Sequence, residues 1–147
     1  MKKLFFLILI LTFYPTFVNS DDTFLSLKKD KVNVRYGPGF DYEVKYIYRK
    51  KNLPLKVVDK KENFRKIIDI KKNNGWIHIS QLKKSKSFIV TKDKILFNKP
   101  TLFSKPIAKI QKGRLLVYKN CIKEWCNVKT DKFIGWVSTD NIWGKIR

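Results

Sequence analysis

Asn63-Phe64-Arg65-Lys66-Ile67 followed by Gly75-Trp76-Ile77 decides the fold, because a similar stretch returns near the end of the chain. The second version reads Glu124-Trp125-Cys126-Asn127-Val128 followed by Gly135-Trp136-Val137. The two tryptophans that follow these glycines are 60 positions apart, and the two preceding aromatic residues are 61 apart. An internal repeat of this period indicates two copies of one small folding unit.

Short apolar alternations predict strands in both copies and no helix of useful length. Phe24–Leu27 and Val32–Val34 show the two-residue period of half-buried strands. Asn73-Asn74-Gly75 predicts a hairpin turn, because Asn and Gly accept positive φ, and Ser80-Gln81-Leu82 predicts a single helical turn. Five short strands and one long early loop per copy predict an all-β chain, with two small five-stranded barrels in tandem.

Residues 1–20 have the layout of a secretory signal peptide. Lys2 and Lys3 precede the apolar run Leu4–Leu11, and Val18-Asn19-Ser20 offers a cleavage site. The alternative is a retained membrane anchor, but the run falls short of the ~20 apolar residues that a bilayer requires. Cleavage after Ser20 predicts a periplasmic or secreted protein without a transmembrane segment in the mature chain.

The domain limits follow from the repeat and from composition. Residues 21–83 are predicted to form the first domain and residues 88–147 the second, with the polar segment 84–87 as a linker. Copies of this size lie near the lower limit for folding on hydrophobic burial alone. Packing of the two copies against each other would therefore stabilise both.

Cys121 and Cys126 are the only cysteines, and both lie in the second copy. If their segment is a hairpin, the two residues face each other across adjacent strands within bridging distance. A disulfide fits an exported protein, while two free thiols or a reactive pair are the alternatives. The spacing is not that of a redox-active pair, and the chain has too few Cys and His residues for a structural zinc site.

The chain is strongly basic, with 33 Lys and Arg against 12 Asp and Glu and a net charge of +21. One interpretation is attraction to anionic polymers. The other is compositional drift, because nearly all the cations are lysines and they are spread along the whole chain. Phosphate recognition by paired hydrogen bonds would favour arginine.

Two motifs of the first copy are Val32-Asn33-Val34-Arg35-Tyr36-Gly37-Pro38-Gly39 and Gly75-Trp76-Ile77. Together they resemble the bacterial SH3-like (SH3b) family, whose pattern is V-N-V-R-x-G-P near the start and G-W-V near the end. The second copy lacks the Arg-x-Gly of the opening motif but keeps Gly135-Trp136-Val137 and ends in Asn141-Ile142-Trp143-Gly144. The layout resembles secreted tandem SH3-like proteins of Gram-negative bacteria.

The resemblance implies a non-catalytic binding module whose ligand is a peptide or a peptidoglycan-type glycan-peptide. In such barrels, aromatic rings beside the early loop can line a groove, and the candidates here are Tyr36, Tyr42 and Tyr48 in the first copy and Phe97 and Phe103 in the second. The alternative is that these rings complete two small cores. Core or inter-copy packing is expected for Trp76, Trp125 and Trp136, and Trp143 is expected to hold the tail onto the barrel.

Catalytic chemistry is not indicated. His78 is the only histidine, the carboxylates are scattered among lysines, and neither a phosphate loop nor a metal-ligand cluster can be recognised. We therefore expect a non-enzyme without cofactor or metal. A second hypothesis is an electrostatic binder of nucleic acid, anionic lipid or polysaccharide, although no specific nucleic acid is predicted. A third is a thiol enzyme built on Cys121 or Cys126.

Overall fold

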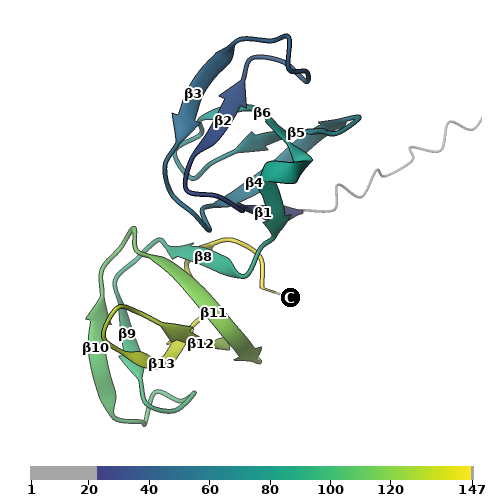
Figure 1. Cartoon of the computed structure of the whole chain (residues 1–147). Coiled ribbons are helices and arrows are strands. Elements are labelled where there is room, and N and C mark those ends of the chain that lie inside the picture. The colour runs from purple at the N-terminus through teal and green to yellow at the C-terminus, as the bar shows by residue number, and fades with distance from the viewer. Residues whose placement is uncertain (1–22, 147) are drawn as a thin grey trace, which may run out of the picture.

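The computed structural model describes residues 23–146, so the predicted signal peptide lies outside the described residues. The chain forms two antiparallel seven-stranded sheets, one after the other (Figure 1). The first consists of β1 (Phe24–Leu27), β2 (Val32–Arg35), β3 (Val44–Tyr48), β4 (Pro54–Lys61), β5 (Phe64–Ile68), β6 (Asn74–His78) and β7 (Leu82–Lys84), with the 3₁₀ turn η1 (Ile79–Gln81). The second consists of β8 (Ser87–Val90), β9 (Lys94–Phe97), β10 (Pro106–Ile110), β11 (Leu115–Ile122), β12 (Trp125–Lys129), β13 (Ile134–Ser138) and β14 (Ile142–Trp143).

The all-β class and the two-unit organisation are confirmed, but each sheet has seven strands and not five. The additional strands carry little sequence signal. All four residues of β8 are buried, so this strand shows no alternation, and β7 and β14 are too short to show a period. The helical turn predicted after β6 is present as η1.

The two sheets have the same topology, β3-β2-β6-β5-β4-β1-β7 and β10-β9-β13-β12-β11-β8-β14. The register is repeated as well, because Arg35 pairs with Trp76 in the first sheet and Phe97 pairs with Trp136 in the second. Positions in the two modules can therefore be equated residue by residue.

Gly75 has a different role from the one expected. The predicted turn at Asn73-Asn74-Gly75 is wrong, because Asn74 already opens β6 and the positive φ falls on Lys72. A Cβ on Gly75 would collide with the side chain of Val34 and lie 3.0 Å from the carbonyl oxygen of Arg35. The glycine of this motif is needed where β6 crosses β2 closely.

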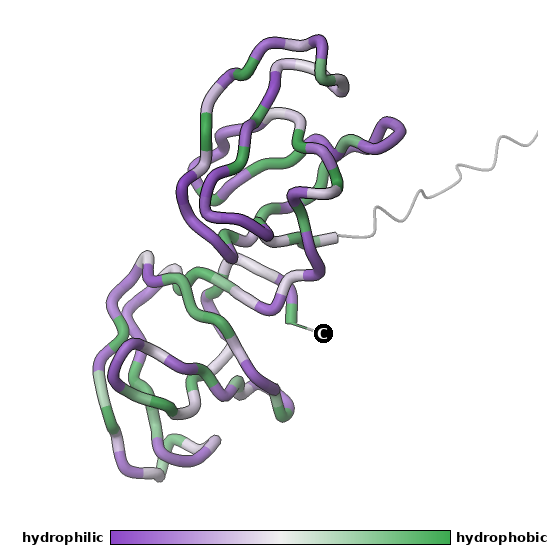
Figure 2. Tube along the Cα trace, viewed as in Figure 1, coloured by the Kyte–Doolittle hydropathy of each residue, from purple (hydrophilic) through white to green (hydrophobic). Residues whose placement is uncertain are grey.

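Each module has its own apolar core, but the first core is completed from the second module. Leu27, Val34, Leu55 and Ile77 are fully buried there, and Ile89 of β8 belongs to the same cluster. Leu115 and Trp143, also from the second module, pack against it. The alternation of apolar and polar residues along the strands is visible in Figure 2.

Polar contacts reinforce this junction. The Ser26 hydroxyl lies 2.7 Å from that of Ser85 and 2.8 Å from that of Ser87, and all three residues are buried. The Trp143 indole donates a hydrogen bond to the Pro54 carbonyl oxygen at 3.2 Å. The predicted linker 84–87 is therefore not a free polar segment. Its first residue ends β7, its last residue, Ser87, begins β8, and Ser85 between them is buried.

Trp143→Ala is expected to lower the free energy of unfolding by about 2–3 kcal/mol, because it removes a half-buried ring and its hydrogen bond from the junction. Urea unfolding followed by circular dichroism measures this loss. Lys83→Ala is the matched control, because Lys83 of β7 holds the position of Trp143 in the first module and is exposed. Equal stability of the two variants would contradict a role for Trp143 in joining the modules.

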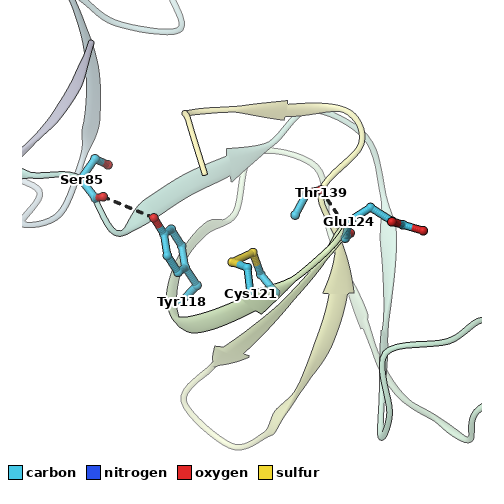
Figure 3. The surroundings of a disulfide bond; sticks show 6 residues. Ser85, Tyr118, Cys121, Glu124 and Thr139 are labelled. Carbon is cyan, nitrogen blue, oxygen red and sulfur yellow. Dashed lines mark hydrogen bonds between the residues drawn. A yellow bond between two sulfur atoms is a disulfide. The ribbon is translucent and has the colours of Figure 1, made fainter. Parts of the chain in front are cut away.

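The predicted disulfide is present and joins Cys121 of β11 to Cys126 of β12 (Figure 3). The two residues are cross-strand partners with Cα atoms 4.0 Å apart. Beyond the bridge, the Glu124 carbonyl oxygen accepts a hydrogen bond from the Thr139 amide at 2.8 Å.

Replacing both cysteines by alanine is expected to lower the free energy of unfolding by about 2 kcal/mol, because the bridge restricts a short loop of the unfolded chain. Urea midpoints with and without reductant give the measurement. Reductant should shift the wild-type midpoint toward that of the double variant and leave the variant unmoved. A wild-type midpoint that ignores reductant would refute the prediction.

Candidate functional site

The first module carries a groove of about 230 Å³ on one side of its sheet. We call it the first-module groove. It is lined by residues from the turn before β2, from β2, the loop after β2, β5, β6 and η1, namely Lys31, Asn33, Arg35, Phe40, Phe64, His78 and Gln81. Its volume lies below the ~300–1,000 Å³ typical of pockets for whole drug-sized ligands, so a short segment of an extended chain suits it.

Three mutually contacting rings form the apolar part of this groove. The Phe40 ring centroid lies 5.2 Å from that of Phe64 and 5.0 Å from that of His78, and Phe64 and His78 are 5.1 Å apart. Phe64 is buried, whereas Phe40 remains 67% exposed. The cluster therefore has an anchored base and one ring that a ligand can cover.

The alternation of β2 places the polar lining. Val32 and Val34 point into the core, so Asn33 and Arg35 share the opposite face. Lys31, two positions before Asn33, also lines the groove. The lining thus combines two cations with the aromatic cluster, and no acidic side chain belongs to it.

Arg35 is held in place by the loop that it borders. Its Nη1 donates hydrogen bonds to the carbonyl oxygens of Tyr42 at 2.6 Å and Phe40 at 3.2 Å. Its guanidinium carbon lies 5.5 Å from the centroid of the Phe40 ring. Because a guanidinium has five N–H donors, this arrangement leaves donors for a carboxylate.

His78 is oriented by the turn that follows β6. Its Nδ1 accepts a hydrogen bond from the Ser80 amide at 3.3 Å and lies 2.8 Å from the Ser80 hydroxyl. These contacts assign the hydrogen of the neutral ring to Nε2, which can donate to a ligand.

Tyr36 and Tyr42 lie on the loop beside the groove but are not among its lining residues. The Tyr42 ring covers Gly37, where a Cβ would collide with it, and its carbonyl oxygen binds Arg35. Tyr36 is exposed, and the Lys45 ammonium lies 5.6 Å from its ring centroid. These two residues therefore shape and flank the loop.

Tyr48 belongs to a hydrogen-bond network away from the groove. Its hydroxyl donates to Asp69 at 3.0 Å and lies 3.3 Å from the Tyr46 hydroxyl. Burial, followed by the Tyr46 contact, raises the pKa of the Tyr48 hydroxyl well above its ordinary value. Asp69 also accepts hydrogen bonds from the amides of Lys71 and Asn73, so the network fixes the turn before β6.

The second module arranges the same positions differently. Phe97 stands where the first module has Arg35, and its ring packs edge-on against Trp125 at 5.8 Å. Trp125 of β12 pairs with Ser138, whereas the corresponding Phe64 of β5 pairs with His78. Phe103, by contrast, is fully exposed on the loop after β9. Tyr36, Tyr42 and Tyr48 therefore do not line the first-module groove, and Phe97 and Phe103 do not come together in a groove of the second module.

The residues that line the first-module groove were not predicted as site residues from the sequence. Arg35 was considered only as part of a fold motif, Phe64 only as part of the repeat, and His78 only as the single histidine of the chain. The alternation of β2 was the available signal, since it places Asn33 and Arg35 on the outer face. Nothing local showed that Phe40 would fold back onto His78.

No group of three or more metal-binding side chains comes together within residues 23–146. In the same part of the chain, no helix has the length and apolarity needed to cross a membrane.

Comparison with known proteins identifies the family. No curated protein matches the chain. Two solved structures, NlpC2 and NlpC1 from Trichomonas vaginalis, match the chain at 14% and 13% identity with a TM-score of 0.38 each. The matches cover 84% of this chain and 48% and 46% of those chains, so less than half of each of those proteins is represented. The family model described as "Bacterial SH3 domain" matches residues 28–84 and again residues 92–144, and the chain therefore belongs to the bacterial SH3 domain family, with two tandem copies.

Proposed function

We propose that this chain is an exported, non-catalytic binding protein whose first-module groove holds a peptide segment of the cell wall. The observation that carries the proposal is the meeting of three aromatic rings with Lys31 and Arg35 in one groove. Bacterial SH3 domains often bind peptidoglycan, and membership of that family supports this class of ligand.

The chemistry of the groove suits a short peptide that carries a carboxylate. Lys31 and Arg35 can neutralise the carboxylate, and Arg35 is already oriented by two carbonyl oxygens. The exposed face of Phe40 can cover a small apolar side chain. Asn33 and Gln81 add hydrogen-bonding groups for the peptide backbone.

A role without bond-making chemistry is supported by the state of the reactive residues. Cys121 and Cys126 are joined to each other, which removes both from thiolate chemistry. His78 is occupied at Nδ1 by Ser80 and faces aromatic rings. The disulfide also supports the export predicted from the N-terminal sequence.

Retention on purified peptidoglycan sacculi tests the groove. Phe40→Ser is expected to weaken retention about tenfold, because it removes the exposed ring, and Lys31→Glu about fivefold, because it repels a carboxylate. The dissociation constant from a sedimentation titration at physiological salt measures both effects.

Leu102→Ser is the matched control. Leu102 lies in the loop after β9, at the place that Phe40 occupies in the loop after β2, and it is similarly exposed at 69%. Retention should be unchanged in this variant. If Phe40→Ser and Leu102→Ser behave alike, or if wild-type retention vanishes at moderate salt, charge alone explains binding and the groove proposal fails.

A further inference from the structure

The loops after β2 and β9 have the same backbone framework. In loop 36–43 the Tyr36 amide binds the Glu43 carbonyl oxygen at 3.2 Å, and in loop 98–105 the Asn98 amide binds that of Lys105 at 3.0 Å. A second contact is also shared, since the amides of Gly39 and Thr101 each bind the carbonyl oxygen two residues earlier. The loops are equal in length, so their positions correspond one to one.

The two loops differ in charge at corresponding positions. Asp41 and Glu43 of the first loop correspond to Phe103 and Lys105 of the second, and Gly37 corresponds to Lys99. At these three positions the second loop thus has two lysines and an aromatic ring in place of two acids and a glycine. The change at Gly37 is sterically allowed because the ring of Tyr42, which would collide with it, is replaced by Ser104.

The apolar side chains of the two loops also differ in direction. In the first loop, Phe40 contacts Phe64 and His78 of its own module. In the second, Phe103 is 100% exposed and Leu102 is 69% exposed. Two large apolar side chains therefore project into solvent between two lysines.

Loop 98–105 is ordered by its own hydrogen bonds. The Ser104 hydroxyl accepts from the Lys99 amide at 2.9 Å, and the Thr101 hydroxyl accepts from the Phe103 amide at 3.3 Å. The backbone position of Phe103 at the tip of the loop is thus fixed before any partner binds, which lowers the entropic cost of ordering the loop on binding. In Figure 1 this loop joins β9 to β10 at the bottom of the molecule, at the end of the second module that faces away from the first.

We propose that loop 98–105 docks the protein on the surface of an anionic lipid bilayer. Leu102 and Phe103 enter the boundary between headgroups and acyl chains, while Lys99 and Lys105 bind the anionic headgroups. A projecting tip with flanking cations suits a deformable anionic surface, because the rings can insert without a preformed partner pocket. The excess of lysines over the whole chain adds long-range attraction to the same surface.

Partition onto vesicles tests the docking. Wild type is expected to bind phosphatidylcholine vesicles that contain one-third phosphatidylglycerol and to bind pure phosphatidylcholine only weakly. Leu102→Ser with Phe103→Ser should lower partition on the anionic vesicles about tenfold, since it removes the inserting groups. Val58→Ser with Ile122→Ser changes two other exposed apolar residues and should leave partition unchanged. All variants begin at Asp21, the first residue after the predicted cleavage site, so the apolar run Leu4–Leu11 makes no contribution.

Insertion has its own readout. Phe103→Trp should be quenched by brominated lipid beyond the background of the four native tryptophans, whereas Asp41→Trp, at the corresponding position of the first loop, should not. Because Phe103 and Asp41 are both exposed, the two Trp variants should keep the wild-type melting temperature. Absence of wild-type binding to anionic vesicles, full binding by the double-serine variant, or an unquenched Trp at position 103 would each overturn the proposal.

Discussion

The structure depends on one shared core at the junction of its two modules. Modules of this size bury little apolar surface by themselves. Here Ile89 of the second module is buried within the first core, and Leu115 and Trp143 pack against it. The Trp143 indole also donates a hydrogen bond to the Pro54 carbonyl oxygen, which fixes the orientation of the ring against the first module. The first module is therefore complete only when the second is folded beside it, and the segment between them is part of the core boundary.

The duplicated framework is preserved while its surface chemistry has diverged. Strand order and register are the same in both sheets. Yet the second module carries a disulfide at Cys121–Cys126, where the first pairs Lys60 with Arg65. In the first module Arg35 lines the groove, and in the second module Phe97 occupies the equivalent position and packs against Trp125. Two copies with one skeleton thus present different surfaces, which is expected when the copies have separate binding partners.

The sequence predicts the parts of this molecule that rest on period and motif. The repeat and the all-β class follow from the spacing of apolar and aromatic residues, and the cysteine bridge follows from a predicted hairpin and the expected export. In contrast, β8 was not predicted, because all four of its residues are buried and show no alternation. Lys94 illustrates a second limit. It holds the buried position of Val32, where its ammonium binds Asp140 at 2.9 Å and Ser138 at 3.2 Å, partners more than forty residues away. Hydrogen bonds from Ser138 and Lys94 hold the pKa of Asp140 well below its usual range. The pairing of Lys94 with Asp140 could not be predicted from the sequence around either residue. The candidate groove was missed for the same reason, since the contact of Phe40 with His78 exists only after the chain has folded.

The buried serine contacts at the junction have a mechanical consequence. Ser26 is tied to both Ser85 and Ser87, and Ser87 donates in turn to the Asn52 carbonyl oxygen, so the connection offers no slack for a hinge. The loop joining β2 to β3 and the loop joining β9 to β10 lie at opposite ends of the molecule (Figure 1). Because the junction holds the two modules in one arrangement, the distance between these two loops is set by the fold, and ligands bound at the two ends would be kept at a fixed separation.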